Sequence, residues 1–326
     1  MIRPDVIKAI GILLLVLALP LQAVAQNVEE DRKTATEIAA LIAPLPKLPL
    51  KSSDLALAPE LARSMGMISS IATDPSGVFY LLQRGPNADP VIAVDHAGKR
   101  LRSWGKGLFT VPHAVRVDGN GDVWTTDSVS SVITKFTPAG EKLLEIPVGG
   151  QPRPGKVSGT TDIAFGPDGR VFIADGYGNA RILEYTSDGK KVREWGTAGT
   201  GPGQFRVPHS IIIDKDGTIY IADRENGRIE RFTLDGKFLG EWTGFGKPMT
   251  LAFTNDGEIL VATGYRNPPG KSPDWVAWVV KVDKATGKPL GYLEVGDDAH
   301  AQAAVDGGIL TGGETGKISA VHWFRP

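Results

Sequence analysis

The 326-residue chain contains no cysteine. This absence excludes disulfide bonds, thiolate metal ligands and cysteine nucleophiles, so stability must come from a large core or from bound metal. Neither charge is in excess, because 36 Lys and Arg residues face 37 Asp and Glu residues. We therefore expect no nucleic-acid partner. Apolar runs of membrane-spanning length are also missing after the N-terminal segment, so no later membrane span is expected.

The N-terminal segment has the pattern of a secretory signal peptide. Arg3 and Lys8 lead into an apolar run over 9–19, and Ala23-Val24-Ala25 forms a small-x-small cleavage site. We expect residues 1–25 to be a signal peptide that is cut after Ala25, which predicts a periplasmic or secreted protein. The alternative is an uncleaved anchor, for which the apolar run is short.

Residues 26–60 are expected to form an N-terminal helix and linker ahead of the main domain, 61–326. The stretch 27–43 has the composition of a short helix, and the proline-rich stretch 44–53 is typical of an extended linker. We expect the protein to be a monomer.

The main domain is built from a repeated unit of short strands. Each unit has an apolar strand, a two-residue turn that ends in glycine, a second strand, a polar loop and a third strand. The turn glycines are Gly77, Gly121, Gly169, Gly217, Gly257 and Gly308. The second strands are also alike, as in RVFIAD (170–175) and TIYIAD (218–223).

Six such repeats predict an all-β fold, a six-bladed β-propeller with NHL-like repeats. Strands of this length cannot bury a face alone, and radial packing buries both faces of every blade. Two stacked β-sandwiches are the alternative, but they explain neither the common period nor the recurrent glycine.

Three of the five histidines occupy one position of the repeat. The residues eight positions before each turn glycine are Ser69, His113, Thr161, His209, Met249 and His300. The first strand of a blade lines the central channel, so histidines on alternate blades are related by rotations of about 120°. Three imidazoles that converge in this way form a three-nitrogen site with open positions, which is typical of catalytic zinc. The alternative for each histidine is an ordinary buried strand residue.

Counting along each hairpin brings three more residues to the same end of the propeller. Arg224 follows Gly217 by seven residues, and the same count gives Arg84 in the first blade and Gly176, next to Tyr177, in the third. Arginine suits a carboxylate ligand, and a phenol beside cations can act as a base. Alternatively, the arginines pair with Asp89 or Glu225, and Tyr177 is an ordinary loop residue. A long loop over 264–275 is expected at the same rim.

These segments resemble a known enzyme family. ADGYGNARI (174–182), VPHS (207–210) and ADRENGRI (222–229) are similar to the catalytic core of peptidyl-α-hydroxyglycine α-amidating lyases, also called peptidylamidoglycolate lyases. The resemblance covers about residues 66–326. It implies a six-bladed propeller that holds zinc and splits the N–C bond of a C-terminal α-hydroxyglycine, giving an amide and glyoxylate.

The resemblance also implies a role for each site residue. His113, His209 and His300 would bind zinc, Tyr177 would take the proton of the substrate hydroxyl, and Arg84 with Arg224 would hold the carboxylate of a small-molecule or peptide substrate. The family's methionine two residues before the third ligand is Asp298 here. Its calcium-binding aspartate directly after that ligand is Ala301, which argues against a structural calcium ion.

Two other functional classes are compatible with a propeller. A gluconolactonase-type hydrolase is also metal-dependent, but it generally uses carboxylate and asparagine ligands for calcium. A non-catalytic NHL-repeat protein would bind a protein or glycan partner, and it would tolerate alanine at all three histidines.

Overall fold

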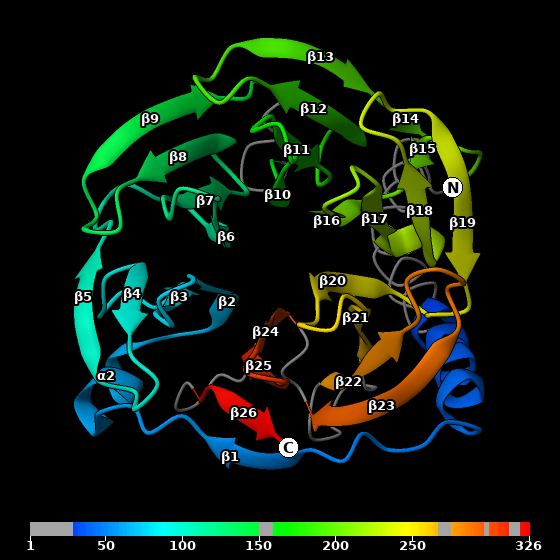
Figure 1. The fold of residues 1–326 in the computed structure, drawn as a ribbon, viewed down its shortest axis with the longest axis horizontal. Helices are drawn as coiled ribbons and strands as arrows, with labels where there is room; N and C mark the ends of the chain where they lie inside the picture. Colours follow the sequence, from blue (N-terminus) through cyan, green and yellow to red (C-terminus); the bar gives the residue numbers. More distant parts are fainter. Residues whose placement is uncertain (1–28, 150–158, 267–274, 297–299, 313–319) are drawn as a thin grey trace, which may run out of the picture.

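The computed structural model describes residues 29–149, 159–266, 275–296, 300–312 and 320–326. The expected signal peptide lies outside these residues. In the described part of the chain, the strands form six four-stranded antiparallel sheets and one small two-stranded sheet. Figure 1 shows the six sheets arranged as blades around a central axis, with β2, β6, β10, β16, β20 and β24 innermost. The predicted six-bladed β-propeller is therefore confirmed.

The blades follow one another along the chain. Blade one consists of β2 (Ile68–Thr73), β3 (Phe79–Gln83), β4 (Val91–Val94) and β5 (Arg100–Trp104). Blade two consists of β6 (Pro112–Val117), β7 (Val123–Asp127), β8 (Val132–Phe136) and β9 (Lys142–Pro147). Blade three consists of β10 (Asp162–Phe165), β11 (Val171–Asp175), β12 (Arg181–Tyr185) and β13 (Lys191–Trp195). Blade four consists of β16 (Pro208–Ile213), β17 (Ile219–Asp223), β18 (Arg228–Phe232) and β19 (Phe238–Thr243). Blade five consists of β20 (Pro248–Phe253), β21 (Ile259–Arg266), β22 (Trp275–Val282) and β23 (Pro289–Gly296). The two-stranded sheet pairs β14 (Thr197–Ala198) with β15 (Gln204–Phe205).

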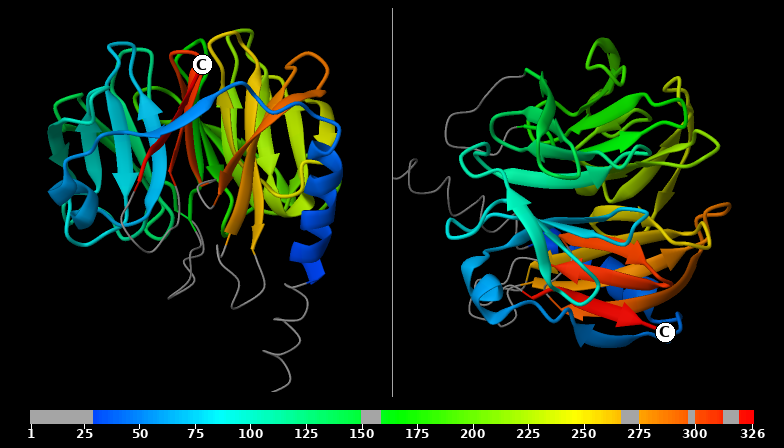
Figure 2. Two further views of the ribbon diagram at one scale, coloured as in Figure 1. Left: turned by 90° about the horizontal axis from the view of Figure 1, so that it is seen from below. Right: turned by 60° about the vertical axis from the view of Figure 1, so that its left-hand side comes forward.

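The sixth blade combines both parts of the chain. Its inner strands are β24 (Ala301–Val305), β25 (Gly308–Gly312) and β26 (His322–Arg325), and its outermost strand is β1 (Lys51–Asp54). Residues 51–53 were expected to be part of a linker, and this expectation is wrong. β1 pairs with β26 in antiparallel register, from Lys51 opposite Arg325 to Asp54 opposite His322. Without β1, the outer edge of β26 would expose unpaired backbone groups. Figures 1 and 2 show this N-terminal strand beside the C-terminal strand at the rim.

Both faces of each blade are buried, as the alternation of the second strands requires. In β3, Phe79 and Leu81 belong to the core cluster between blades six and one, whereas Tyr80 and Leu82 belong to the cluster between blades one and two. Similar clusters lie between each further pair of neighbouring blades. The apolar surface is therefore buried between blades rather than in one central core.

In blades one to five, the glycine turns are longer than the two-residue turns that the sequence suggested, whereas blade six keeps a two-residue turn because Val305 pairs with Gly308. In the first blade, the Gly77 N–H donates to the Asp74 carbonyl at 3.0 Å, and the Asp74 carboxylate accepts from the N–H groups of Ser76 and Val78 at 2.9 and 3.0 Å. Gly77 closes this turn with φ +86°. Asp118 and Asp214 accept turn N–H groups in the same way in blades two and four, so in these three blades an aspartate side chain satisfies the backbone of the longer turn.

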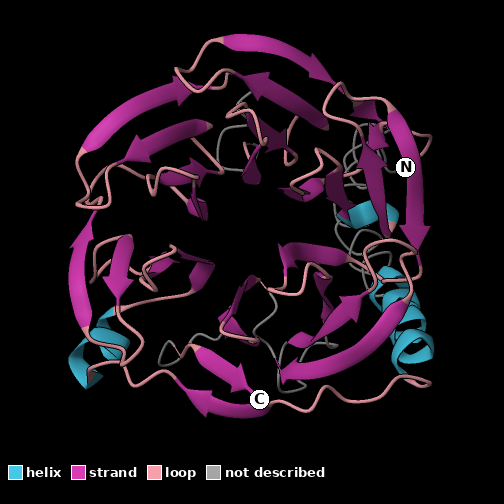
Figure 3. Cartoon of the chain, in the orientation of Figure 1, coloured by secondary structure: helices cyan, strands magenta, loops and turns pink. Residues whose placement is uncertain are grey.

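The N-terminal segment packs along the outside of the ring. A helix over residues 29–42 lies beside blades four and five, and the short helix α2 (Pro59–Ser64) packs against blade one through the buried Leu61. Figure 3 shows both helices at the periphery. No helix of the described residues is long and apolar enough to cross a membrane.

The segment that closes the ring should contribute measurably to stability through Leu55, which directly follows β1, is buried against blades six and one, and donates its N–H to the Val321 carbonyl. We expect Leu55→Ala to lower the free energy of unfolding by about 2–5 kcal/mol, because the substitution removes buried methyl groups and leaves a cavity in their place. Denaturant unfolding measures this change. Leu101→Ala on the exposed outer face of β5 is the control, with an expected change within about 0.5 kcal/mol. Equal effects of the two substitutions would show that the closing segment adds little.

Candidate metal centre

The residues of the histidine column all lie where an inner strand begins. In four blades, the ladder between the first and second strands shifts register at this point, which leaves one residue of the inner strand out of the pairing. The residues left out are Ser69, His113, Met249 and His209. Thr161 and His300 directly precede β10 and β24. A bulge re-aims the side chain of the residue that leaves the ladder, and here it turns the column toward the axis.

The structure brings the three predicted histidines together. The nitrogen atoms that His113, His209 and His300 offer lie within 4.8 Å of one another. Their ring centroids are separated by 5.0, 5.1 and 5.4 Å. His113 and His209 are 3% exposed. Among the described residues, this is the one cluster of three or more His, Cys, Asp or Glu side chains that could hold a metal ion.

The other three residues of the column fix how each imidazole is protonated. Every histidine directs Nδ1 at a main-chain carbonyl of the next blade. The acceptors for His113, His209 and His300 are the carbonyls of Thr161, Met249 and Ser69, at 2.6, 2.7 and 2.8 Å. A carbonyl oxygen only accepts, so each Nδ1 carries a hydrogen and each Nε2 keeps a lone pair. Each blade that carries a histidine is thus followed by a blade that supplies the carbonyl acceptor for that histidine.

The surroundings also keep the imidazoles neutral. Burial, followed by the neighbouring charges of His300 and His209, holds the pKa of His113 well below its usual range. Burial and the charge of Arg224 do the same for the pKa of His209. Burial, together with the charges of Arg84 and Arg224, lowers the pKa of His300 to about 3. Neutral imidazole is the form that binds metal.

Tyr177 lies between two of these histidines. Its hydroxyl is 2.9 Å from Nε2 of His113 and 2.9 Å from Nε2 of His209. One hydroxyl hydrogen can serve only one of the two lone pairs, so the three Nε2 atoms together offer more acceptors than this phenol can satisfy. A cation bound at the centre would satisfy the remaining lone pairs. The residues present therefore fit a zinc ion held by three imidazole nitrogens.

A glycine allows Tyr177 to reach this position. Gly176 passes so close to the next blade that a Cβ atom there would lie 2.2 Å from the Pro208 carbonyl oxygen. No other residue fits without moving this loop or β16, which carries His209. The tyrosine and the histidine are thus placed by the same close contact.

Both predicted arginines lie at this centre, since their charges act on the histidines. Arg84 donates through Nε to the Pro112 carbonyl at 2.9 Å and approaches Met67 Sδ at 3.4 Å through Nη1. Arg224 places its guanidinium 5.7 Å from the centre of the Tyr177 ring, and its Nε donates to Glu225 at 2.9 Å. The pairing with Glu225 that was considered from sequence is therefore present.

Sequence reasoning missed the carboxylates that hold the histidine-bearing segments. Asp127 ends β7 and accepts from the N–H groups of Thr110 and Val111, at 2.6 and 2.9 Å. Asp223 ends β17 and accepts from the Arg206 N–H at 2.7 Å. Both aspartates are buried. The recurrent Asp at the end of the second strand was visible in the sequence and is the signal that could have revealed them.

The residues that directly follow the histidine column in the sequence bear on the argument against a structural calcium ion. Ala301 is buried where the family's aspartate would stand. Asp162 is the one carboxylate among the residues that directly follow the column in the sequence, and it already pairs with Arg116 at 2.8 Å and Ser210 at 2.7 Å. A protein cation thus compensates this charge, which agrees with the argument against calcium. Asp298 and the loop over 267–274 lie outside the described residues.

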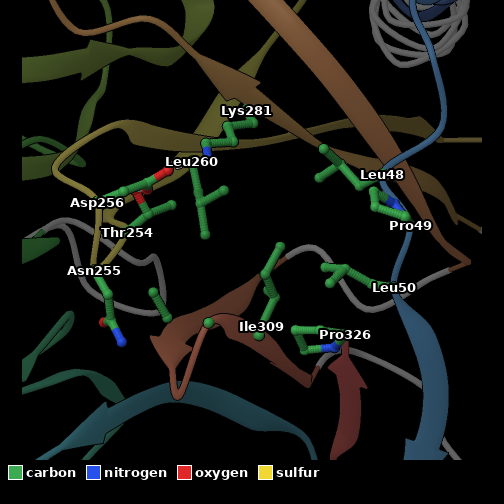
Figure 4. Close-up of a pocket in the computed structure, with 13 residues that line it drawn as sticks. Leu48, Pro49, Leu50, Thr254, Asn255, Asp256, Leu260, Lys281, Ile309 and Pro326 are labelled. Atoms are coloured by element: carbon green, nitrogen blue, oxygen red, sulfur yellow. Dashed lines mark hydrogen bonds and ion pairs between the residues drawn. The ribbon is translucent and has the colours of Figure 1, made fainter.

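A separate cavity of about 400 Å³ opens between blades five and six at the opposite end of the propeller. Leu50, Leu260, Ile309 and Pro326 line it, together with the Asp256 turn (Figure 4). None of the site residues line this cavity. The histidines lie where the inner strands begin, whereas the Asp256 turn follows the end of the inner strand β20.

Comparisons with known proteins identify relatives of this chain. A family model described as a six-bladed β-propeller matches residues 161–244. The probable peptidyl-α-hydroxyglycine α-amidating lyase of Caenorhabditis elegans is 30% identical over 236 residues, which cover 69% of this chain and 67% of the relative. The peptidyl-glycine α-amidating monooxygenase of Mus musculus is 36% identical over 173 residues, which cover 49% of this chain but only 18% of the relative.

A solved structure shares the fold. A catalytically inactive variant of virginiamycin B lyase from Staphylococcus aureus, with quinupristin, aligns with a TM-score of 0.59 at 17% identity and covers 85% of this chain and 99% of its own. At this identity the likeness concerns the propeller alone. The match to the Caenorhabditis elegans protein over two thirds of its length, on a six-bladed propeller, shows that the chain belongs to the peptidyl-α-hydroxyglycine α-amidating lyase family.

Proposed function

We propose that the protein is a zinc-dependent carbon–nitrogen lyase that cleaves an α-hydroxyglycine-type substrate into an amide and glyoxylate. The observation that carries the proposal is the set of three Nε2 lone pairs, which the Nδ1 hydrogen bonds aim at one point beside Tyr177. The names of the relatives support the reaction type.

Each residue has a defined task in this reaction. Arg84 and Arg224 bind the substrate carboxylate and orient the hydroxyl carbon toward Tyr177. Tyr177 acts as the general base that takes the hydroxyl proton. The C–O bond becomes C=O as the C–N bond breaks, and the same proton passes to the departing amide nitrogen. Zinc, when bound to the three histidines, supplies Lewis acidity toward the substrate oxygen. No proton is gained or lost in sum.

The location and partners form part of the same proposal. The pattern of residues 1–25 supports export to the periplasm or the medium, and the two arginines support a small-molecule or peptide substrate with a carboxylate. We propose that the enzyme acts there as a monomer.

The two alternative functions fit the centre less well. A gluconolactonase-type hydrolase would place oxygen ligands around calcium, whereas the cluster here consists of imidazoles. A non-catalytic NHL-repeat protein gives no reason for three neutral histidines, two of them buried, to converge on one point with a phenol.

Metal analysis of the purified full chain tests the ligands. We expect about one zinc ion per chain, and His209→Ala should weaken zinc binding by more than about 100-fold because one of three ligands is lost. His322→Ala is the matched control, since His322 lies on β26 and pairs with Asp54 at the rim. Unchanged zinc content in His209→Ala would contradict the assignment.

Kinetics test the role of Tyr177. Zinc-loaded protein should release glyoxylate from a peptide with a C-terminal α-hydroxyglycine. Tyr177→Phe should lower kcat by about 10²–10⁴-fold with zinc content retained, because the phenyl ring keeps the packing but loses the base. Tyr292→Phe on β23 controls for the loss of a hydroxyl elsewhere. Hydrolysis of a lactone in place of glyoxylate release, or full activity of Tyr177→Phe, would argue against the proposed reaction.

A further inference from the structure

Arg224 is the first member of a chain of alternating charges that leads away from the metal centre. Its Nε donates to Oε1 of Glu225 at 2.9 Å, and the other carboxylate oxygen, Oε2, lies 3.2 Å from Nζ of Lys247. The side chains of all three residues are only 21–23% exposed. These contacts connect η1 (Arg224–Asn226) to the segment that leads into β20.

The two cations beside Glu225 favour its ionised form. Burial raises the pKa of this carboxyl, but the charges and hydrogen bonds of Arg224 and Lys247 together outweigh burial and hold its pKa below the usual range. Glu225 is therefore ionised between two cations. With Lys247 present, the carboxylate is shared, so it does not fully cancel the positive charge of Arg224.

The helix over residues 29–42 determines where Lys247 lies. Gly246, with φ +63°, lets the backbone pass so close to the helix that a Cβ atom would lie 2.7 Å from Cγ1 of Ile38. Ile38 is fully buried and Thr34 nearly so. Glu30 and Asp31 of the same helix each lie 3.8 Å from Nζ of Lys247. The helix thus contacts this segment by both packing and charge.

We propose that Glu225 and Lys247 are positioning residues for Arg224, and that the helix over residues 29–42 holds Lys247 in place. The inference rests on the proposed function, in which Arg224 binds the substrate carboxylate. It gives the segment ahead of the propeller a role in substrate binding. Neither positioning residue needs to contact the substrate, because each acts through the guanidinium of Arg224.

The test is the affinity of the zinc-loaded full chain for glyoxylate, measured by calorimetry, together with KM and kcat for the hydroxyglycine peptide. Lys247→Met should weaken glyoxylate binding and raise KM by about three- to tenfold, with zinc content unchanged and kcat within about twofold. Lys247→Arg should restore binding. Gly246→Ala should act in the same direction as Lys247→Met, because its Cβ displaces the segment from Ile38.

Two controls separate positioning from general damage. Lys142→Met removes an exposed pair with Glu145 on β9 and should change nothing. In an Arg224→Ala background, Lys247→Met should have no further effect, because the two residues act as one unit. An undiminished effect in that background, or wild-type affinity in Lys247→Met, would overturn the inference while leaving the proposed lyase intact. Absence of glyoxylate binding in the wild type would overturn both, whereas binding without lyase activity would overturn only the proposed reaction.

Discussion

The hydrogen bonds from the histidine Nδ1 atoms to the carbonyls of the neighbouring blades are the constraint on which the rest of the centre depends. Each bond joins a blade with a histidine to one without, so all six blades contribute to a site with three ligands. Because a carbonyl cannot donate, the bonds choose the tautomer before any metal arrives. They also fix the ring planes, so little ordering is left to the binding step.

This constraint explains why ring closure matters for chemistry as well as for stability. His300 belongs to blade six and Ser69 to blade one, so the bond between them crosses the seam where the two ends of the chain meet. The seam is closed by β1, which adds the outermost strand to blade six. A loose seam would therefore free the third imidazole to rotate, even with the other two intact.

The sequence predicted the parts of the centre that follow from repetition. The turn glycines set the register, the register placed His113, His209 and His300 at one level, and antiparallel counting returned Arg84, Tyr177 and Arg224 to that level. Features that depend on contacts between blades could not be found in this way. The carbonyl acceptors carry no side-chain signal, the bulges at His113 and His209 follow from backbone pairing, and β1 shares no pattern with the other outer strands. The link from Arg224 to Lys247 joins different repeats, so no count within one hairpin reveals it.

The concentration of positive charge at the axis supports an anionic substrate. Arg84 and Arg224 already lower the pKa values of the buried histidines, and a divalent cation among them would increase the repulsion in a region that water screens poorly. The repulsion falls when a negatively charged ligand enters, and the carboxylate of the proposed substrate would supply this charge. Glu225 pairs with Nε of Arg224 and is itself shared with Lys247, so it offsets only part of the repulsion. A neutral ligand would leave the cations uncompensated, which supports the proposed carboxylate substrate over a neutral one.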